Sequence, residues 1–153
     1  MSETDLYSQA LAAADPGDIN YYKGEIDGRW SHWLVEFDRY TGRLVDSKAL
    51  LDTETGHHTV NTVVGVVTMR LVYGVDKGHL GGWVVFLDGP PSLSRENRKE
   101  LAWLHLSSQG WVNLKGEPYT DRRGRLSVEA VLKAVVAGKL AFMTSHIHQV
   151  AAR

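Results

Sequence analysis

The sequence of 153 residues contains no cysteine. This absence excludes disulfides, thiolate-ligated zinc, iron–sulfur clusters and cysteine nucleophiles. Long hydrophobic runs are missing too, since stretches such as Trp83–Leu87 are far too short to cross a bilayer. The first residues, Met1–Asp5, are acidic and lack the basic-then-apolar order of a signal peptide. We therefore expect a cytoplasmic protein with no membrane partner.

Familiar catalytic motifs are also lacking. The sequence has no Gly-x-Ser-x-Gly elbow, no Gly-x4-Gly-Lys-Ser/Thr loop, no Gly-x-Gly-x-x-Gly fingerprint and no His-Glu-x-x-His. These patterns carry nucleophilic, phosphate-binding, dinucleotide-binding and zinc chemistry respectively. No motif therefore specifies a reaction, and we expect no cofactor.

Composition is that of an ordinary globular chain, with 43% hydrophobic and 23% charged residues. No repeat or low-complexity linker divides it, so we predict one compact domain over residues 1–153. The net charge of −1 conceals a split: residues 1–76 hold 6 basic and 12 acidic side chains, and residues 77–153 hold 11 and 6. Either the basic half serves an anionic partner, or the two halves attract each other in the fold.

The first part of the chain predicts one helix followed by strands. Ser2 can cap a helix that Asp15-Pro16-Gly17 ends. Beyond it, apolar and aromatic residues alternate with polar ones, which is typical of strands. The pattern predicts a three-stranded antiparallel meander over Ile19–Ile26, Trp30–Phe37 and Leu44–Leu51.

Two further strands and a helix are predicted in the middle of the chain. Valine-rich Thr59–Val75 predicts a strand, interrupted near Gly65 because 17 residues exceed the usual length. Gly82–Leu87 predicts a short strand, and Ser94 can cap a helix that runs to about Ser108.

The C-terminal part starts with a hairpin or extended loop over Trp111–Leu126. Ser127 can cap a helix with apolar residues at helical spacing, which Gly138 is expected to end. Leu140–Val150 is either a last strand or a second helical piece. The order of elements predicts an α+β fold, in which a mainly antiparallel sheet packs with two to three helices.

Histidines provide one candidate for chemistry. His146 and His148 would share one face of a strand, since side chains alternate along it. If the loop residues His57 and His58 approached them, the imidazoles could bind zinc or another divalent metal. The sequence does not show that the two pairs meet, and solvent-exposed histidines are the alternative.

A second histidine pattern consists of His57-His58-Thr59 and His105-Leu106-Ser107. It is similar to the paired His-x-Thr/Ser motifs of the two-histidine phosphoesterase family. That resemblance implies that His57 and His105 exchange protons with a phosphodiester while the hydroxyls hold the phosphate. Composition alone yields about 0.9 such triplets, so the pattern does not establish the family.

Basic and aromatic residues provide a further candidate. Mixtures of arginine and aromatic side chains grip phosphates and stack on bases, although nearby acidic residues dilute the charge here. The candidate nucleic-acid contacts are Arg95, Arg98, Trp111, Arg122, Arg123 and Arg125.

Tryptophans suggest a protein interface instead. Trp30 and Trp33 fall on opposite faces of their predicted strand, so at least one is expected to point away from the core. We conclude that the sequence favours a small, non-catalytic binding or regulatory domain whose partner is a protein, a nucleic acid or a second copy of the chain. The alternative is a histidine-dependent hydrolase, either metal-assisted or a phosphodiesterase.

Overall fold

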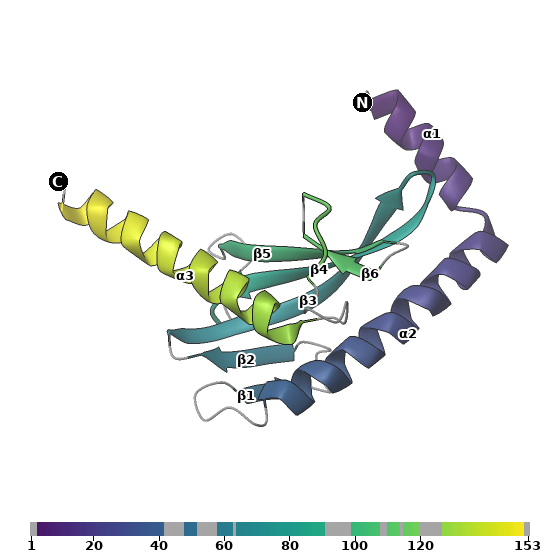
Figure 1. Ribbon diagram of the computed structural model, residues 1–153. Coiled ribbons are helices and arrows are strands. Elements are labelled where there is room, and N and C mark those ends of the chain that lie inside the picture. Colours follow the sequence, from purple (N-terminus) through teal and green to yellow (C-terminus); the bar gives the residue numbers. More distant parts are fainter. Residues whose placement is uncertain are drawn as a thin grey trace.

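The protein has an α+β fold in which three helices pack with a six-stranded antiparallel sheet (Figure 1). The computed structural model describes residues 3–41, 48–51, 58–62, 64–90, 99–107, 110–113, 115–119 and 127–151. Within these ranges the fold class predicted from the sequence is confirmed, with a mainly antiparallel sheet and helices packed against it.

The sheet is a meander in which each strand pairs with the next one along the chain. Its strands are β1 (Lys48–Leu51), β2 (His58–Thr62), β3 (Gly65–Asp76), β4 (His79–Asp88), β5 (Glu100–Ser107) and β6 (Gly110–Val112). The long central strands β3 and β4 are joined by Lys77 and Gly78, whose φ angles of 51° and 81° are both positive. Two such residues make the tight turn that matches the natural twist of a hairpin.

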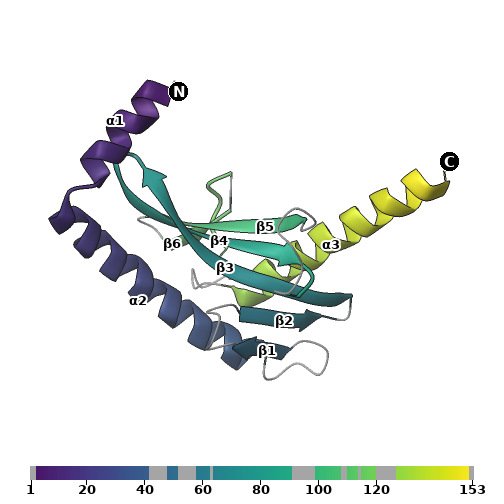
Figure 2. The same ribbon diagram turned by 180° about the vertical axis from the view of Figure 1, so that it is seen from behind.

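Two of the helices cover one face of this sheet, as both views show (Figures 1 and 2). The helices are α1 (Glu3–Ala13), α2 (Pro16–Thr41) and α3 (Val128–Ala151). Helix α2 crosses the face diagonally and α3 packs beside it, whereas α1 lies against the far end of the β3–β4 hairpin. The core therefore lies between the sheet and the pair α2 and α3.

The core is assembled from the inward-facing residues of the strands and one stripe of each covering helix. Alternate residues of the central strands point inward, and the inward residues Val67, Met69, Val84, Phe86 and Leu104 are all buried. Helix α2 contributes Trp33 and Phe37, and α3 contributes Val128, Val131 and Val135.

The first two predicted strands are wrong, because Ile19–Ile26 and Trp30–Phe37 are parts of the single helix α2. Their buried residues are seven and four positions apart, so one face of a helix carries them to the sheet. Gly24 and Gly28 do not interrupt it, since both face open space. The antiparallel meander does occur in the N-terminal half, but it is built by β1, β2 and β3.

The helix predicted from Ser94 to Ser108 is also wrong over its described residues. Glu100–Ser107 is strand β5, in which Ala102, Leu104 and Leu106 pack toward the core at alternate positions. The sequence spacing also permits a helix, but burial of these alternate residues favours the strand. Ser94 lies outside the described residues.

Other predictions from the sequence are confirmed. Helix α1 is present, and the Asp15 carboxylate accepts hydrogen bonds from the backbone N–H groups that start α2. The long valine-rich strand is interrupted next to Gly65, whose φ of 118° favours glycine. The Ser127 hydroxyl caps α3 by accepting a hydrogen bond from the Ala130 N–H at 3.1 Å.

The predicted stop at Gly138 is wrong, since α3 continues without interruption to Ala151. Gly138 serves a different purpose: a Cβ atom there would overlap the backbone carbonyl oxygen of Leu101 in β5. The missing side chain therefore allows the helix to lie directly on the strand. Leu140–Val150 is accordingly helical, as one of the two alternatives from the sequence proposed.

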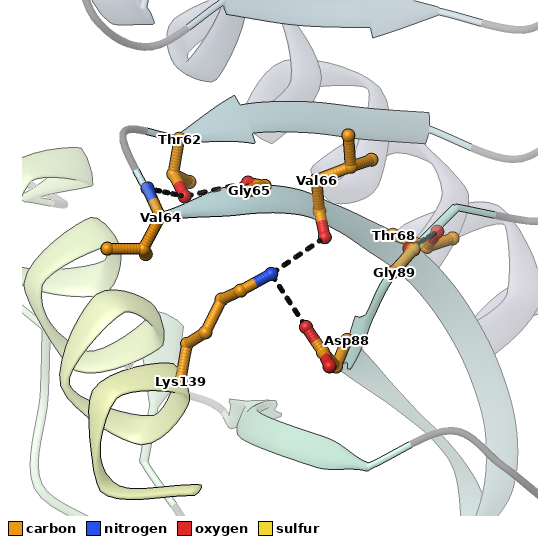
Figure 3. Close-up of polar contacts among 8 residues, drawn as sticks. All are labelled: Thr62, Val64, Gly65, Val66, Thr68, Asp88, Gly89 and Lys139. Atoms are coloured by element: carbon orange, nitrogen blue, oxygen red, sulfur yellow. Dashed lines mark hydrogen bonds and ion pairs between the residues drawn. The ribbon is translucent and has the colours of Figure 1, made fainter. Parts of the chain in front are cut away.

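Next to Gly138, Lys139 fixes the helix to the sheet (Figure 3). Its side chain is only 9% exposed, and its Nζ lies 2.7 Å from Oδ1 of Asp88 at the end of β4. The same ammonium group donates a hydrogen bond to the Val66 carbonyl oxygen at 3.3 Å. A buried ammonium group that lost this partner would remain uncompensated, so the pair determines where α3 can lie.

We predict that Gly138→Ala destabilises the protein even though alanine is the better helix former. The overlap with Leu101 is expected to cost about 1–3 kcal/mol, which exceeds the gain of about 1 kcal/mol in helix propensity. Gly28→Ala is the matched control, because nothing lies within 4 Å of its position and it should stabilise the protein. Urea unfolding measures both, and a stabilised Gly138→Ala variant would contradict the close packing.

We also predict that Lys139→Met lowers the free energy of unfolding by about 1–3 kcal/mol, since Asp88, whose side chain is 27% exposed, then loses its countercharge and is only partly screened by water. Lys133→Met is the matched control: its ammonium group is 78% exposed and pairs with Glu129 within the same helix. This exposed pair should contribute less than about 1 kcal/mol. Equal effects of the two substitutions in urea unfolding would show that the Lys139 pair does not anchor α3.

Candidate functional site

A cleft of about 620 Å³ lies beside the β3–β4 hairpin. This volume lies within the usual range for ligand sites. We call it the hairpin cleft. Its lining comes from three places: the N-terminal half of α2, the hairpin itself, and the end of β5 with the chain that follows it.

Helix α2 forms one wall of the hairpin cleft. Tyr22, Glu25, Ile26 and Arg29 line it at spacings of three and four, which places them on one face of the helix. Tyr21 contributes next to them, and its ring packs edge-on against Tyr22 at 5.2 Å. The wall thus presents two aromatic rings and one charge of each sign.

The floor of the cleft is the start of β4, where His79 is exposed and Gly81 and Gly82 are buried. Strand β5 pairs with β4 only as far as Trp83, opposite His105, and then turns to pair with β6. Among the described residues, no strand therefore pairs with this edge of β4 over His79–Gly82. Gly82 also lets α2 approach, because a Cβ there would come within 2.7 Å of the Ile26 side chain.

Asp76 and His105 line the other wall, and they belong to a packed group with Trp83 on the face of the sheet that α2 and α3 leave open. The Trp83 ring lies over Gly74 and Gly81, where a Cβ would come within 2.9 Å of it. His105 stacks on this ring with a centroid distance of 4.7 Å and an interplanar angle of 15°. Its Nε2 lies 3.1 Å from Oδ2 of Asp76, which is close enough for an ion pair when the imidazole is protonated.

Formal charges in the lining are balanced, which limits the kind of ligand that fits. Glu25 and Asp76 are opposed by Arg29 and Lys77. A polyanion would gain from an excess of positive charge, which this cleft does not offer. Charges of both signs, aromatic rings and an edge of β4 that no described strand pairs with suit a neutral or zwitterionic ligand.

A polar clasp holds the α2 wall in place. The Tyr73 hydroxyl on β3 donates a hydrogen bond to the Asp27 carboxylate, and Lys23 pairs with the same carboxylate at 2.6 Å. Burial raises the pKa of Tyr73, and the hydrogen bond to Asp27 raises it further. Burial also pushes the pKa of Asp27 up, but the hydrogen bonds from Lys23 and Tyr73 outweigh it and lower that pKa.

The clasp should make stability depend on pH. Because the pKa of Asp27 is lowered in the folded state, its carboxyl binds a proton less readily there than in the unfolded chain. Its contribution to stability is present above the ordinary pKa of 3.8 and is lost as pH falls through the folded pKa. Because the pKa of Tyr73 is raised, its contribution to stability is present below the ordinary pKa of 10.0. That contribution is lost as pH rises through the folded pKa.

We predict that Tyr73→Phe reduces the loss of stability at both acidic and alkaline pH, because it removes the titrating hydroxyl and a hydrogen bond of Asp27. Urea unfolding over a series of pH values measures the effect. Tyr7→Phe is the control, since the Tyr7 ring on α1 is 66% exposed and outside the clasp. Superimposable pH curves for wild type and Tyr73→Phe would contradict the clasp.

The tryptophans predicted to bind a partner prove to be mostly core residues. Trp33 is fully buried and Trp111 is 7% exposed, with their rings 6.3 Å apart, so neither is an exposed contact. The prediction placed Trp33 on a strand, whereas it lies on helix α2. Trp30 is half-buried and packs edge-on against His58 at 5.4 Å.

The predicted metal ligands are not brought together. His58 lies on β2, whereas His146 and His148 lie on the exposed C-terminal half of α3. The strand on which the latter two would share a face is not formed, because Leu140–Val150 takes the helical alternative and residues two apart on a helix point to different sides. His57 lies outside the described residues, and among those that are described no three His, Asp or Glu side chains gather around a metal position.

The paired phosphoesterase-like motifs can be compared only in part. His105 lies on β5, whereas His58, the neighbour of His57, lies on β2. Strands β3 and β4 run between them, which separates the two strands by about 14 Å. His57 itself lies outside the described residues, so the pairing of His57 with His105 stays a prediction.

The predicted nucleic-acid contacts Arg95, Arg98, Arg122, Arg123 and Arg125 lie outside the described residues. Sequence reasoning also missed most of the hairpin cleft. The signals were present in the helical spacing of Tyr22, Ile26 and Arg29, and in the glycines that follow His79.

Helix α3 is long and apolar enough, by length and composition, to cross a membrane: Val128–His148 has a mean hydropathy of 1.3 in its most apolar window. This property is weak evidence, because Val128, Val131, Leu132 and Val135 are needed in the protein core. Lys139 is held in an ion pair with the sheet in the middle of the same stretch.

No protein-family model, no curated protein and no solved structure matches the chain.

Proposed function

We propose that the protein is a binding module that captures an extended peptide segment in the hairpin cleft. The observation that carries the proposal is the edge of β4 over His79–Gly82, which no described strand pairs with and which lines the cleft. An extended peptide can add a strand to such an edge through main-chain hydrogen bonds.

The walls supply what a bound peptide needs besides its backbone contacts. Tyr21 and Tyr22 offer aromatic surface on one side, and the His105 imidazole lies on the other. Arg29 and Glu25 can each pair with a side chain of opposite charge. A cleft of about 620 Å³ holds a segment of a few residues, so affinity in the micromolar range is expected.

We predict that peptides selected from a random displayed library against the protein bind Tyr21→Ala at least about fivefold more weakly, because truncating an interface aromatic typically costs more than about 1 kcal/mol. Tyr7→Ala is the matched control: the two rings are 64% and 66% exposed, but only Tyr21 lines the cleft. Fluorescence polarisation measures the dissociation constants.

Strand addition itself is tested with peptides that are N-methylated at one position at a time. Methylation of alternate amides should abolish binding, since only these face β4. Unchanged affinity along the whole series, or equal weakening by Tyr7→Ala and Tyr21→Ala, would overturn the proposal. Failure to select any peptide that depends on the cleft would do the same.

A second candidate function, a hydrolase, rests on the Asp76–His105 pair. A carboxylate that orients an imidazole leaves the other ring nitrogen to accept a proton from water or a hydroxyl. Turnover of chromogenic carboxylic or phosphate esters that is lost in His105→Gln but kept in the exposed-surface variant His32→Gln would favour this reading.

A further inference from the structure

The C-terminal half of α3 leaves the body of the protein, as both ribbon views show (Figures 1 and 2). Every side chain from Leu140 to His148 is exposed. Several of these residues are large and apolar, with Met143 42% and Ile147 63% exposed. A projecting helix with such residues lacks the partner that would normally cover them.

The exposed apolar residues continue a stripe that begins on the body. Val136, Leu140, Met143 and Ile147 are spaced by four, three and four, which is the seam that one helix presents to another. On the body, the same stripe borders an apolar groove lined by Tyr40, Leu132, Val136 and Leu140. We call this hollow the α3 groove, and we call Met143 and Ile147 the α3 ridge.

The groove and the ridge match each other in length and chemistry. The groove follows α3 over Leu132–Leu140 and the projecting end runs over Met143–Ala151, so each part is about 13 Å long. The charged rim of the groove is already neutralised, because Lys133 lies 3.5 Å from Glu129. No free charge of the rim would therefore oppose an apolar helix.

From these features we infer that two copies of the chain associate through antiparallel α3 helices, with each α3 ridge lying in the α3 groove of the other copy. A two-fold axis between Leu140 and Met143 places Val136 opposite Ile147 of the second copy. Because the two copies are related by a two-fold axis, the α3 helix of each copy supplies one groove and one ridge. The two bodies then lie at opposite ends of the helix pair, where the projecting halves leave room for them.

The chemistry of the projecting end favours a helical partner over a lipid surface. No Lys or Arg lies between Leu140 and His148, so this stretch itself offers no cation to anionic lipids. Ser145 lies on the opposite side of the helix from the ridge. Phe142, which is 38% exposed, also lies outside the ridge stripe.

Sedimentation equilibrium of the full chain tests the inference. We expect a monomer–dimer equilibrium with a dissociation constant on the order of micromolar, as is usual for a small interface. Ile147→Glu should weaken it at least about tenfold, because it buries a charge in the groove of the other copy. Ser145→Glu is the matched control and should leave the equilibrium unchanged. A monomer at all concentrations, or a dimer that Ile147→Glu does not weaken, would overturn the inference.

Single cysteines test the orientation, since the natural chain has none. An antiparallel pair should give an oxidised heterodimer when Val136→Cys and Ile147→Cys proteins are mixed, and little crosslinking of Ile147→Cys with itself. Efficient self-crosslinking of Ile147→Cys would show a parallel pair and overturn the arrangement. Binding of monomers to phosphatidylcholine–phosphatidylglycerol vesicles that is lost in Ile147→Glu would identify a membrane as the occupant instead.

Discussion

The rest of the structure depends on the contact between α3 and the sheet at Gly138 and Lys139. The missing side chain at Gly138 lets the helix touch the backbone of β5, and Lys139 pairs with Asp88 at the end of β4. Together they fix both the depth and the position of the helix along its axis. Because the helix is fixed at this point, the residues before it fill the core and the residues after it must leave the body. One pair of neighbouring residues thereby divides α3 into a structural half and an exposed half.

Sequence reasoning recovered the elements in which local signals and tertiary burial agree. The cap at Ser127, the helix that follows it and the break near Gly65 belong to this group. It failed in α2, where aromatic residues and the Asp27-Gly28 dipeptide favoured a hairpin, although Ile26, Trp33 and Phe37 are spaced for one helical face. Tertiary burial decided between the two patterns, since a sheet with an uncovered apolar face needs a helix on it.

The candidate site was harder to predict for a different reason. His105 was singled out from the sequence, but its partner Asp76 lies 29 positions away and is brought to it by pairing of β3, β4 and β5. The accessible edge of β4 results from the point at which β5 turns away, and no short sequence pattern encodes such a divergence. For this edge the local signal was in the glycines at 81 and 82, because a strand rarely has two adjacent residues without side chains unless something approaches its backbone.

Helix α2 contributes to both of the surfaces that are proposed to bind partners. Its N-terminal half lines the hairpin cleft, and Tyr40 near its C-terminus lines the α3 groove. Communication between them would require a helix with two alternative positions on the sheet. The contact of Ile26 with Gly82 and the clasp from Asp27 to Tyr73 hold the first half, while Trp33 and Phe37 are fully buried in the core. With the helix fixed along its length, occupation of one surface has no mechanical route to the other, and the two surfaces should bind independently.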